Sequence, residues 1–416
     1  MLTGLHERLP RVLEPDGSTW LPKSFTNIRT SLSLSVAEFM RSYFVCCHAR
    51  LMLTAYTFPY DRVHDLYQEY YRSALRSFCD ANGIKYRERT GAYASALLVK
   101  LRELRHSYKL RGLMKHESAC SLLDGLAGLL TRGSVRPPTS IGLYEFVTSS
   151  GETITFAIDS LDRGEICGDL AETCDLYFKS NYWPSLWYPD NVLPLPNMNP
   201  LVSRELSFFK ELQRTPKTTD LFAFFRIWGG SNEVDGLEHN LSLIESLSRV
   251  PCSKFLCAYL VAGDVAALGK RLDEQGIHWT TEPMAKHELW RRAAASRLNI
   301  VRLGMHECLP WRMIDIFAMG GCPVIDYGPQ TRWPIPLIED EHYLNLHMQT
   351  GGRKRGTISD NVLRWLSDPD QPERIGRNTA DYFNRHLQPA ALGQHIVAQL
   401  PAAQQRMLSA DRLTVA

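Results

Sequence analysis

The residues best suited to chemistry lie in one stretch, residues 303–326, with the sequence LGMHECLPWRMIDIFAMGGCPVID. A loop in it brings His306, Glu307 and Arg312 close together between two apolar runs, and Asp315 follows three residues after the arginine. Arginine can hold a phosphate group with two hydrogen bonds, and a carboxylate can accept hydrogen bonds from ribose hydroxyls. These residue types therefore favour a site for a nucleotide diphosphate.

A helix that begins at this loop would strengthen such a site. Leu309 or Pro310 is the expected start, because proline suits the first turn of a helix. The free backbone N–H groups and the positive end of the helix dipole then attract an anion. In the alternative interpretation, Arg312 only pairs with Asp315 one turn along the same helix.

Residues 218–350 alternate between strand and helix patterns. Five strands are expected, at DLFAFFRIW, KFLCAYLV, IHWTTE, LNIVRLG and CPVIDYG, with a helical pattern between successive strands. This alternation predicts a doubly wound parallel sheet. The fold class is therefore α/β.

Ligands of such a sheet bind at the carboxyl ends of its strands, so the residues there are the candidates for binding. We expect contacts from Arg226, Glu282, Gly304, Met305, His306, Glu307, Leu309, Arg312 and Asp315. Alternatively, Glu282 only caps the helix that follows it, and His306 and Glu307 are surface residues of a loop.

The N-terminal half offers two carboxylates at the end of a predicted strand. Residues 141–160 are typical of a β-hairpin with Ser-Ser-Gly at its turn, and Asp159 and Asp162 follow the second strand. A carboxylate in this position can take the proton of an attacking hydroxyl group. Asp159 can also serve as a turn residue that satisfies nearby amides.

Two further segments allow both a functional and a structural interpretation. Residues 85–115 hold nine Lys or Arg and two Glu, so the helical pattern in 100–115 either contacts an anionic surface or is a solvated face. The aromatic run NYWPSLWYP, residues 181–189, either packs internally or stacks on a sugar. The irregular run 187–202, with four prolines, is expected to connect two domains.

Composition sets the broad class. The chain has 416 residues, 44% of them hydrophobic and 22% charged, which is typical of a globular protein with two domains. The net charge of +2 indicates no global field that attracts nucleic acid.

Cysteine usage and hydropathy suggest the compartment. The ten cysteines include no CxxC pair, and several lie in apolar runs, which favours a reducing cytoplasm. The first residues lack the apolar core of a signal peptide. No transmembrane segment is expected, because the most apolar early stretch carries Glu38, Arg41 and Arg50. We expect a cytoplasmic protein, with peripheral membrane contact through 100–115 as an option.

The common catalytic and nucleotide-binding motifs are absent: the sequence has no GxGxxG, GxxxxGK[ST], HExxH or GxSxG. One DxD triplet, Asp368–Pro369–Asp370, lies between two predicted helices, where it fits a stop and a cap better than a metal site. No metal site or cofactor is predicted.

Residues 288–326 resemble the donor-binding half of GT-B glycosyltransferases, most closely the exostosin-like ones. In those proteins a strand and a glycine-containing loop precede an arginine that opens a helix; an acidic residue comes three positions on, and a strand of small residues follows. Gly304, Arg312, Asp315 and the run 320–325 occupy those places here. The Glu-x7-Glu pattern of many members is present only as Glu307-x7-Asp315, and the N-terminal half resembles no known family.

The resemblance implies two Rossmann-like domains that face a cleft, with the nucleotide sugar held mainly by the second domain. We expect a helix-rich acceptor-side domain at 1–200, a donor-binding domain at 201–385, and a helix at 386–416 that crosses back to the first domain.

The implied activity is metal-independent transfer of a sugar from a UDP-, GDP- or dTDP-sugar to an unidentified acceptor, with Asp159 or Asp162 as the catalytic carboxylate. Two alternatives remain open: a nucleotide-sugar epimerase of the same build, which needs no acceptor, and a non-catalytic module that binds nucleotide sugars.

Overall fold

The structure is a computed structural model, which describes residues 51–57, 62–90, 140–228, 234–304, 308–348 and 357–400. Predictions for Met305, His306, Glu307 and the segment 100–115 lie outside these residues. All the described residues belong to one compact unit.

The first sheet has six strands in the order β2-β1-β3-β4-β5-β6. Its strands are β1 (Met52–Thr57), β2 (Lys85–Thr90), β3 (Ile141–Val147), β4 (Thr153–Asp159), β5 (Leu176–Lys179) and β6 (Val192–Pro194). Only β3 is antiparallel to its neighbours among these described strands. The predicted hairpin is confirmed as β3 and β4, and Gly151 supplies the positive φ of 82° at the turn.

The proline-rich run 187–202 is not wholly a connection, which corrects the expectation from its composition. Val192–Pro194 forms the edge strand β6, beside β5. Proline removes a backbone donor and so hides a strand from sequence patterns, yet an edge strand tolerates it because one side needs no partner. The 3-10 turn Val202–Arg204 and helix α6 (Leu206–Leu212) then lead to the second sheet.

The second sheet is parallel throughout its described strands, as the alternation predicts. Its order is β12-β11-β10-β7-β8-β9, and β12 is an edge strand beyond the five that were expected. Its strands are β7 (Thr219–Trp228), β8 (Lys254–Ala262), β9 (His278–Thr280), β10 (Ser296–Val301), β11 (Cys322–Ile325) and β12 (Leu344–Asn345). The connecting helices are α7 (Val234–Ser248), α8 (Val265–Glu274), α9 (Lys286–Ala294) and α10 (Trp311–Ala318).

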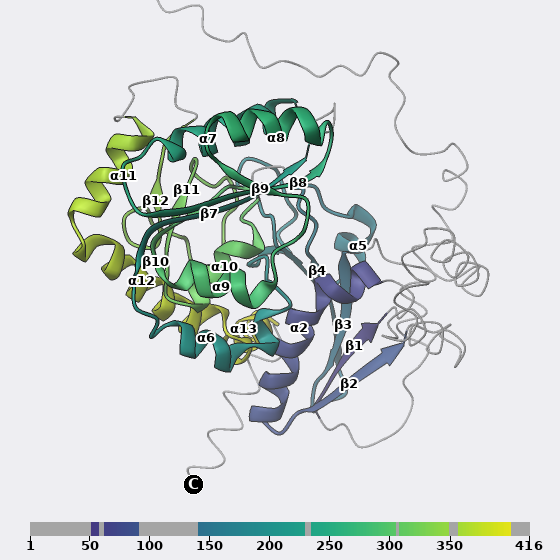
Figure 1. Ribbon diagram of the computed structural model, residues 1–416. Coiled ribbons are helices and arrows are strands. Elements are labelled where there is room, and N and C mark those ends of the chain that lie inside the picture. The colour runs from purple at the N-terminus through teal and green to yellow at the C-terminus, as the bar shows by residue number, and fades with distance from the viewer. Residues whose placement is uncertain are drawn as a thin grey trace, which may run out of the picture. The chain divides into compact units, whose positions relative to one another are not determined.

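Each face of the second sheet has its own apolar cluster. Helices α7 and α8 cover one face, and α9 and α10 cover the other (Figure 1). The cluster under α10 continues into the first sheet, where it includes Tyr144 and Phe156. One core therefore joins the two sheets through the α10 side.

The C-terminal part returns to the first sheet. Helices α11 (Ile358–Ser367) and α12 (Asp370–Tyr382) pack on the second sheet, and a π-helical turn, Phe383–Leu387, leads to α13 (Pro389–Ala398). Helix α13 packs against α2 (Arg62–Ala81), and the Tyr70 hydroxyl donates to the Leu387 carbonyl at 2.7 Å. The expected fold class, two Rossmann-like sheets with a C-terminal helix that crosses back, is confirmed. No described helix combines the length and hydropathy needed to span a membrane.

Candidate functional site at the carboxyl ends of the two sheets

The order of the second sheet places a topological switch point between β7 and β10. The chain runs outward from β7 to β8 and β9, and outward on the other side from β10 to β11 and β12. At such a point the two crossovers diverge and leave room for a ligand at the carboxyl ends of the strands. Gly304, just after β10, donates its N–H to the Cys308 carbonyl at 2.9 Å. A Cβ there would lie 2.5 Å from the Cys308 sulfur, so the tight turn favours glycine.

Arg312 lies in the first turn of α10, where the sequence predicts it. Its guanidinium group donates to the Phe224 carbonyl and sits 5.5 Å from the centre of the Phe224 ring, on the strand β7. Burial lowers the pKa of Arg312 to about 10, and Asp315 offsets only part of that shift. Among the described residues it forms no ion pair, so it is a partly buried cation at the switch point without a carboxylate partner.

Asp315 does not pair with Arg312 in the way the alternative interpretation supposes. Its buried carboxylate accepts hydrogen bonds from the Trp290 indole at 2.9 Å and from the Asn199 amide. Burial raises the pKa of Asp315, and Lys286 and these donors oppose the shift. Asp315 therefore ties α9 and α10 to the connection between the sheets, and each carboxylate oxygen already has a donor.

Of the other predicted contact residues, Arg226 and Leu309 belong to segments at the switch point, and Glu282 does not. Arg226 is an exposed residue of β7. Because side chains alternate between the two faces of a strand, it lies on the same face as Phe224, two residues nearer the carboxyl end. Leu309 is buried, so its side chain is not available to a ligand. Glu282 follows the edge strand β9, which β7 and β8 separate from β10, roughly 14 Å away at normal strand spacing. The structure does not bring Glu282 to the switch point.

Three further residues lie at this edge: Asp326, which follows a predicted strand, and His239 and Arg302, which sequence reasoning missed. The buried carboxylate of Asp326, after β11, accepts from the Leu303 amide at 3.2 Å and hydrogen-bonds to His239 Nε2 at 2.9 Å. His239 comes from α7, and 24% of its side chain is exposed. Arg302, at the end of β10, has a buried Nε with no hydrogen-bond partner among the described residues. A buried orphan donor marks a place where a ligand or water supplies the missing acceptor. Arg302 lies within the predicted strand LNIVRLG, beside Gly304, whereas nothing in the sequence pairs His239 with Asp326.

In the first sheet, Asp159 ends β4 and is fully buried. Its carboxylate accepts from the Lys179 ammonium at 3.0 Å, the Tyr177 hydroxyl at 2.6 Å and the Leu161 amide at 2.9 Å. Burial lowers the pKa of Lys179, against the attraction of Asp159, and burial with Asp159 raises the pKa of Tyr177. Gln68 of α2 fixes this end of β4 through bonds to the carbonyls of Ser140 and Ile158. Asp159 thus has its charge and both oxygens satisfied inside the first sheet.

Asp162 is the carboxylate that reaches the other sheet. It is only partly buried, its backbone carbonyl accepts from the Asn181 amide, and its carboxylate lies 3.4 Å from the Asn197 amide nitrogen. Burial raises the pKa of the Cys308 thiol to about 12, and Asp162 adds to that shift. Cys308 belongs to the loop between β10 and α10, so Asp162 lies beside the switch point.

Further contacts hold the two carboxyl edges together. The Trp311 indole, at the start of α10, donates to Asn197 at 3.1 Å and meets the Tyr67 ring at 5.3 Å. Thr331 donates to Asn181, and the Arg332 amide donates to the Tyr182 carbonyl at 2.8 Å. The loops after β4, β5 and β6 therefore face those after β10 and β11.

The aromatic run 181–189 is partly packed and partly exposed. Tyr182 and Tyr188 lie with ring centres 4.4 Å apart, and Tyr188 donates to the Gly164 carbonyl at 2.7 Å. Trp187, by contrast, is 85% exposed. A free aromatic face beside the junction suits stacking on a sugar ring or an apolar group.

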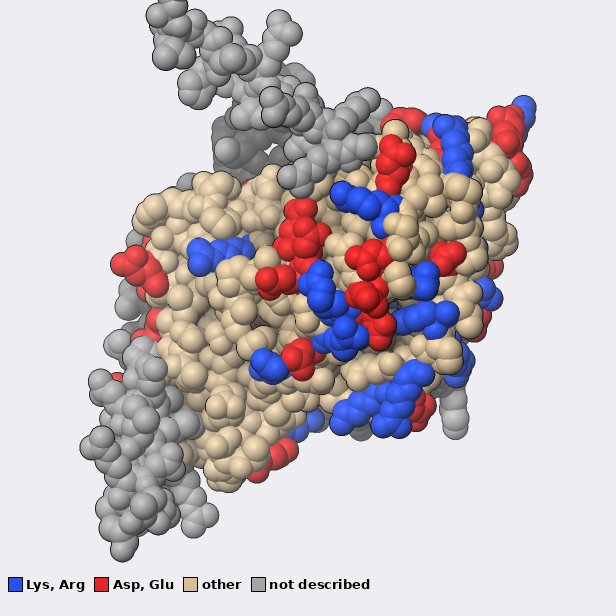
Figure 2. All heavy atoms as spheres, turned by 90° about the vertical axis from the view of Figure 1, so that its left-hand side faces the viewer, with Lys and Arg blue, Asp and Glu red and all other residues tan. Residues whose placement is uncertain are grey.

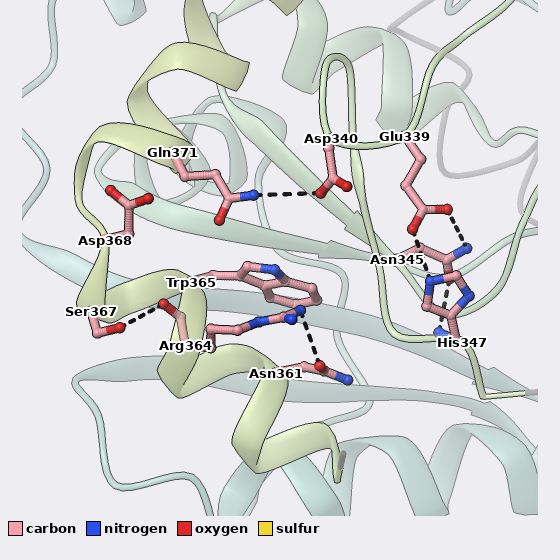
Figure 3. Close-up of a pocket in the computed structure, with 10 residues that line it drawn as sticks. All are labelled: Glu339, Asp340, Asn345, His347, Asn361, Arg364, Trp365, Ser367, Asp368 and Gln371. Atoms are coloured by element: carbon pink, nitrogen blue, oxygen red, sulfur yellow. Dashed lines mark hydrogen bonds and ion pairs between the residues drawn. The ribbon is translucent and has the colours of Figure 1, made fainter. Parts of the chain in front are cut away.

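A polar hollow of about 370 Å³ lies away from the switch point, along the edge strand β12 (Figure 3). Two of its acids already have partners: Glu339 contacts His347 at 2.8 Å, and Asp340 accepts from Gln371 at 3.4 Å. The DxD triplet lies here, because Asp368 lines the hollow at the end of α11. Within the described ranges, no group of three His, Cys, Asp or Glu side chains is arranged to hold a metal ion.

No family model matches the sequence, and no curated protein matches it. Solved structures with a similar fold include Anabaena HepE in complex with UDP and glucose, with a TM-score of 0.41 and 10% identity, covering 85% of this chain and 99% of that one. MurG of Acinetobacter baumannii gives a TM-score of 0.33 and 11% identity over 77% of this chain and 86% of its own. The C-terminal domain of LpcC, a group 1 glycosyl transferase of Francisella tularensis, gives 0.29 and 13% over 44% and 93%. At such low identities and TM-scores, the likeness by itself assigns no function.

Proposed function

We propose that the protein is a GT-B-type glycosyltransferase that moves a sugar from a nucleotide-sugar donor to an acceptor hydroxyl. The observation that carries the proposal is Arg312, a partly buried cation without a carboxylate partner among the described residues, at the switch point of a parallel sheet. A diphosphate supplies the missing negative charge. The N-cap residue Pro310 makes no side-chain hydrogen bond to α10, so the first amides of that helix add a second attraction.

In this scheme the donor lies across the carboxyl ends of β7 and β10. Arg312, Arg226 and the orphan donor of Arg302 stabilise the charge that grows on the leaving diphosphate, and such electrostatic stabilisation usually contributes most to the rate of these transfers. These cations take the place that a metal ion fills in metal-dependent transferases, so we propose that transfer is metal-independent. Asp326 orients His239, and Asp315 binds Trp290 next to α10. His239 is placed to donate to a phosphate or ribose oxygen.

The acceptor approaches from the first sheet. Of the two predicted carboxylates, Asp162 is the better general base, because Asp159 is committed to Lys179 and Tyr177. The exposed ring of Trp187 offers the acceptor an aromatic surface. The division that goes with this scheme is an acceptor-side part at 1–200, a donor part at 201–385 and a returning helix at 386–416.

Nucleotide binding tests the proposal first. Titration calorimetry with UDP, GDP and dTDP should give binding by one of them, and Arg312→Ala should weaken that binding by roughly 1.5 to 3 kcal/mol, the usual cost of a lost charge-assisted bond. Arg271→Ala is the matched control, because Arg271 of α8 already forms ion pairs with Glu238 and Glu245 of α7. Binding of no nucleotide, or equal binding by both variants, would contradict the proposal.

Turnover separates the proposal from its alternatives. A transferase should consume the sugar nucleotide only slowly until an acceptor mixture is added. Conversion of the donor into an isomer without acceptor would indicate an epimerase, and tight binding without any conversion would indicate a binding module.

A further inference from the structure

A second polar hollow lies at the opposite edge of the second sheet, where the strands begin. Its volume is about 530 Å³, and its walls come from the loop 213–217, the first residues of β10 and β11, and α12. The six-residue strand β10 spans roughly 20 Å from this edge to the switch point, so one small ligand cannot touch both. The hollow is therefore independent of the donor site.

The charges that line this hollow are mostly positive. The charged residues that line it are Arg214, Lys217, Arg297, Arg377 and Glu373. We name this hollow the basic pocket. Arg377 pairs with Glu373 at 3.0 Å, and Arg297 lies 3.6 Å from Asp220. Lys and Arg side chains gather toward the lower edge of the face that α11 and α12 present (Figure 2).

The other two cations lack a counter-charge. Among the described residues, neither Arg214 nor Lys217 has a carboxylate within ion-pairing distance. The Lys217 ammonium donates to the Ala294 carbonyl at 2.6 Å, and burial lowers its pKa. Two unpaired cations from one loop face two paired ones from β10 and α12, so the pocket carries excess positive charge.

Close packing and a hydrogen bond hold the backbone that forms the walls of the basic pocket. Gly376 of α12 packs so closely on Gly320 that a Cβ would lie 2.5 Å from the Gly320 carbonyl oxygen. Gln213 donates to the Ala318 carbonyl at 2.8 Å, which holds the loop 213–217 against α10. A rigid pocket costs little ordering free energy when it binds.

We propose that the basic pocket binds an anion that carries phosphate groups. Arg214 and Arg377 offer planar donor groups that match phosphate oxygens, and Lys217 adds a point charge from the same loop as Arg214. A small phosphorylated molecule and the headgroup of an anionic lipid share this chemistry. The volume admits either.

Calorimetric titration with inorganic diphosphate tests the pocket, with the donor site occupied by a saturating amount of whichever nucleotide, UDP, GDP or dTDP, binds there. The double variant Arg214→Gln/Lys217→Gln should bind diphosphate roughly tenfold or more weakly than the wild type, because two charge-assisted contacts are lost. The control is Arg249→Gln/Lys270→Gln, which removes the same charge from exposed positions outside the pocket. The two sources of phosphate are then separated with phosphatidylcholine vesicles with and without phosphatidylglycerol.

Each outcome decides the proposal. Diphosphate binding that only the pocket variant weakens supports a free phosphorylated ligand. Salt-sensitive binding to the phosphatidylglycerol vesicles that only the pocket variant loses supports a lipid headgroup. Absence of both, or equal effects of the two double variants, overturns the proposal. A repeat without the nucleotide shows whether the donor site itself binds diphosphate, so failure there is distinguished from failure at the basic pocket.

Discussion

At the scale of single residues, two aspartates that look alike in sequence have different surroundings. Asp159 is fully buried and balanced by Lys179, whereas Asp162 is partly exposed and lies beside the loop that follows β10. A base needs access to its substrate, and a buried ion pair needs both members. The two residues should therefore fail in different ways when they are altered.

Asp162→Asn should lower kcat by roughly two to four orders of magnitude, the usual contribution of a general base, and leave the urea midpoint nearly unchanged. Asp159→Asn should instead cost about 3 to 5 kcal/mol of stability, because it leaves Lys179 buried without its counter-charge. Urea unfolding and steady-state kinetics of both variants measure this. Loss of activity in a fully stable Asp159→Asn protein, with an active Asp162→Asn protein, would reverse the assignment.

At the scale of elements, close backbone approach sets the position of α12. Gly376 lies in the helix interior, where alanine normally has the higher helix propensity. Its Cβ would nevertheless meet the carbonyl oxygen of Gly320, which itself has a φ of 65°. A backbone atom cannot rotate away as a side chain can, so packing outweighs propensity here.

Gly376→Ala should therefore destabilise the protein by about 1 to 3 kcal/mol. Gly168→Ala, in α5 (Gly168–Thr173), is the control, because nothing lies within 4 Å of the Cβ built there. Thermal and urea unfolding give the comparison. Equal stability of the two variants would mean that α12 shifts freely on the sheet.

At the scale of the whole molecule, the chain after α12 joins the two sheets. The π-helical turn carries His386, and α13 carries His395 where it packs toward α2. Burial lowers the pKa of His386 and of His395. Arg385 lowers the pKa of His386 further, and His386 does the same for His395. The neutral forms are therefore favoured in the folded protein.

A histidine with a lowered folded pKa keeps its full stability contribution above its unfolded value, about 6.5, and loses it as the pH falls below that value. The unfolded chain then binds a proton that the native chain does not. We expect the urea midpoint to drop between about pH 6.5 and pH 5, and His395→Gln to reduce that dependence. His278→Gln, at an exposed position of β9, is the control. A profile that His395→Gln leaves unchanged would contradict the expectation.

The sequence by itself determined the type of most elements and their succession along the chain. Hydrophobic period, β-branched runs and glycine positions are local signals, so the parallel sheet, the β3–β4 hairpin and the start of α10 next to Pro310 could be predicted from residues close together in the chain. The position of Arg312 in the first turn of α10 followed from the same signals. The edge strand β6 was missed, because proline hides strand character from a local pattern.

Tertiary structure alone decided which residues meet. Glu282 and Arg312 both follow strands of one sheet, yet strand order places two strands between β9 and β10, and order is a long-range property. The pairing of His239 with Asp326, and of Asp315 with Asn199 rather than Arg312, depends on side chains that converge from distant segments. The sequence gives the type of each residue and therefore the charge that it can carry. The fold then decides whether that charge has a partner. It brings Lys179 to Asp159, and it gives Arg312 no carboxylate partner among the described residues.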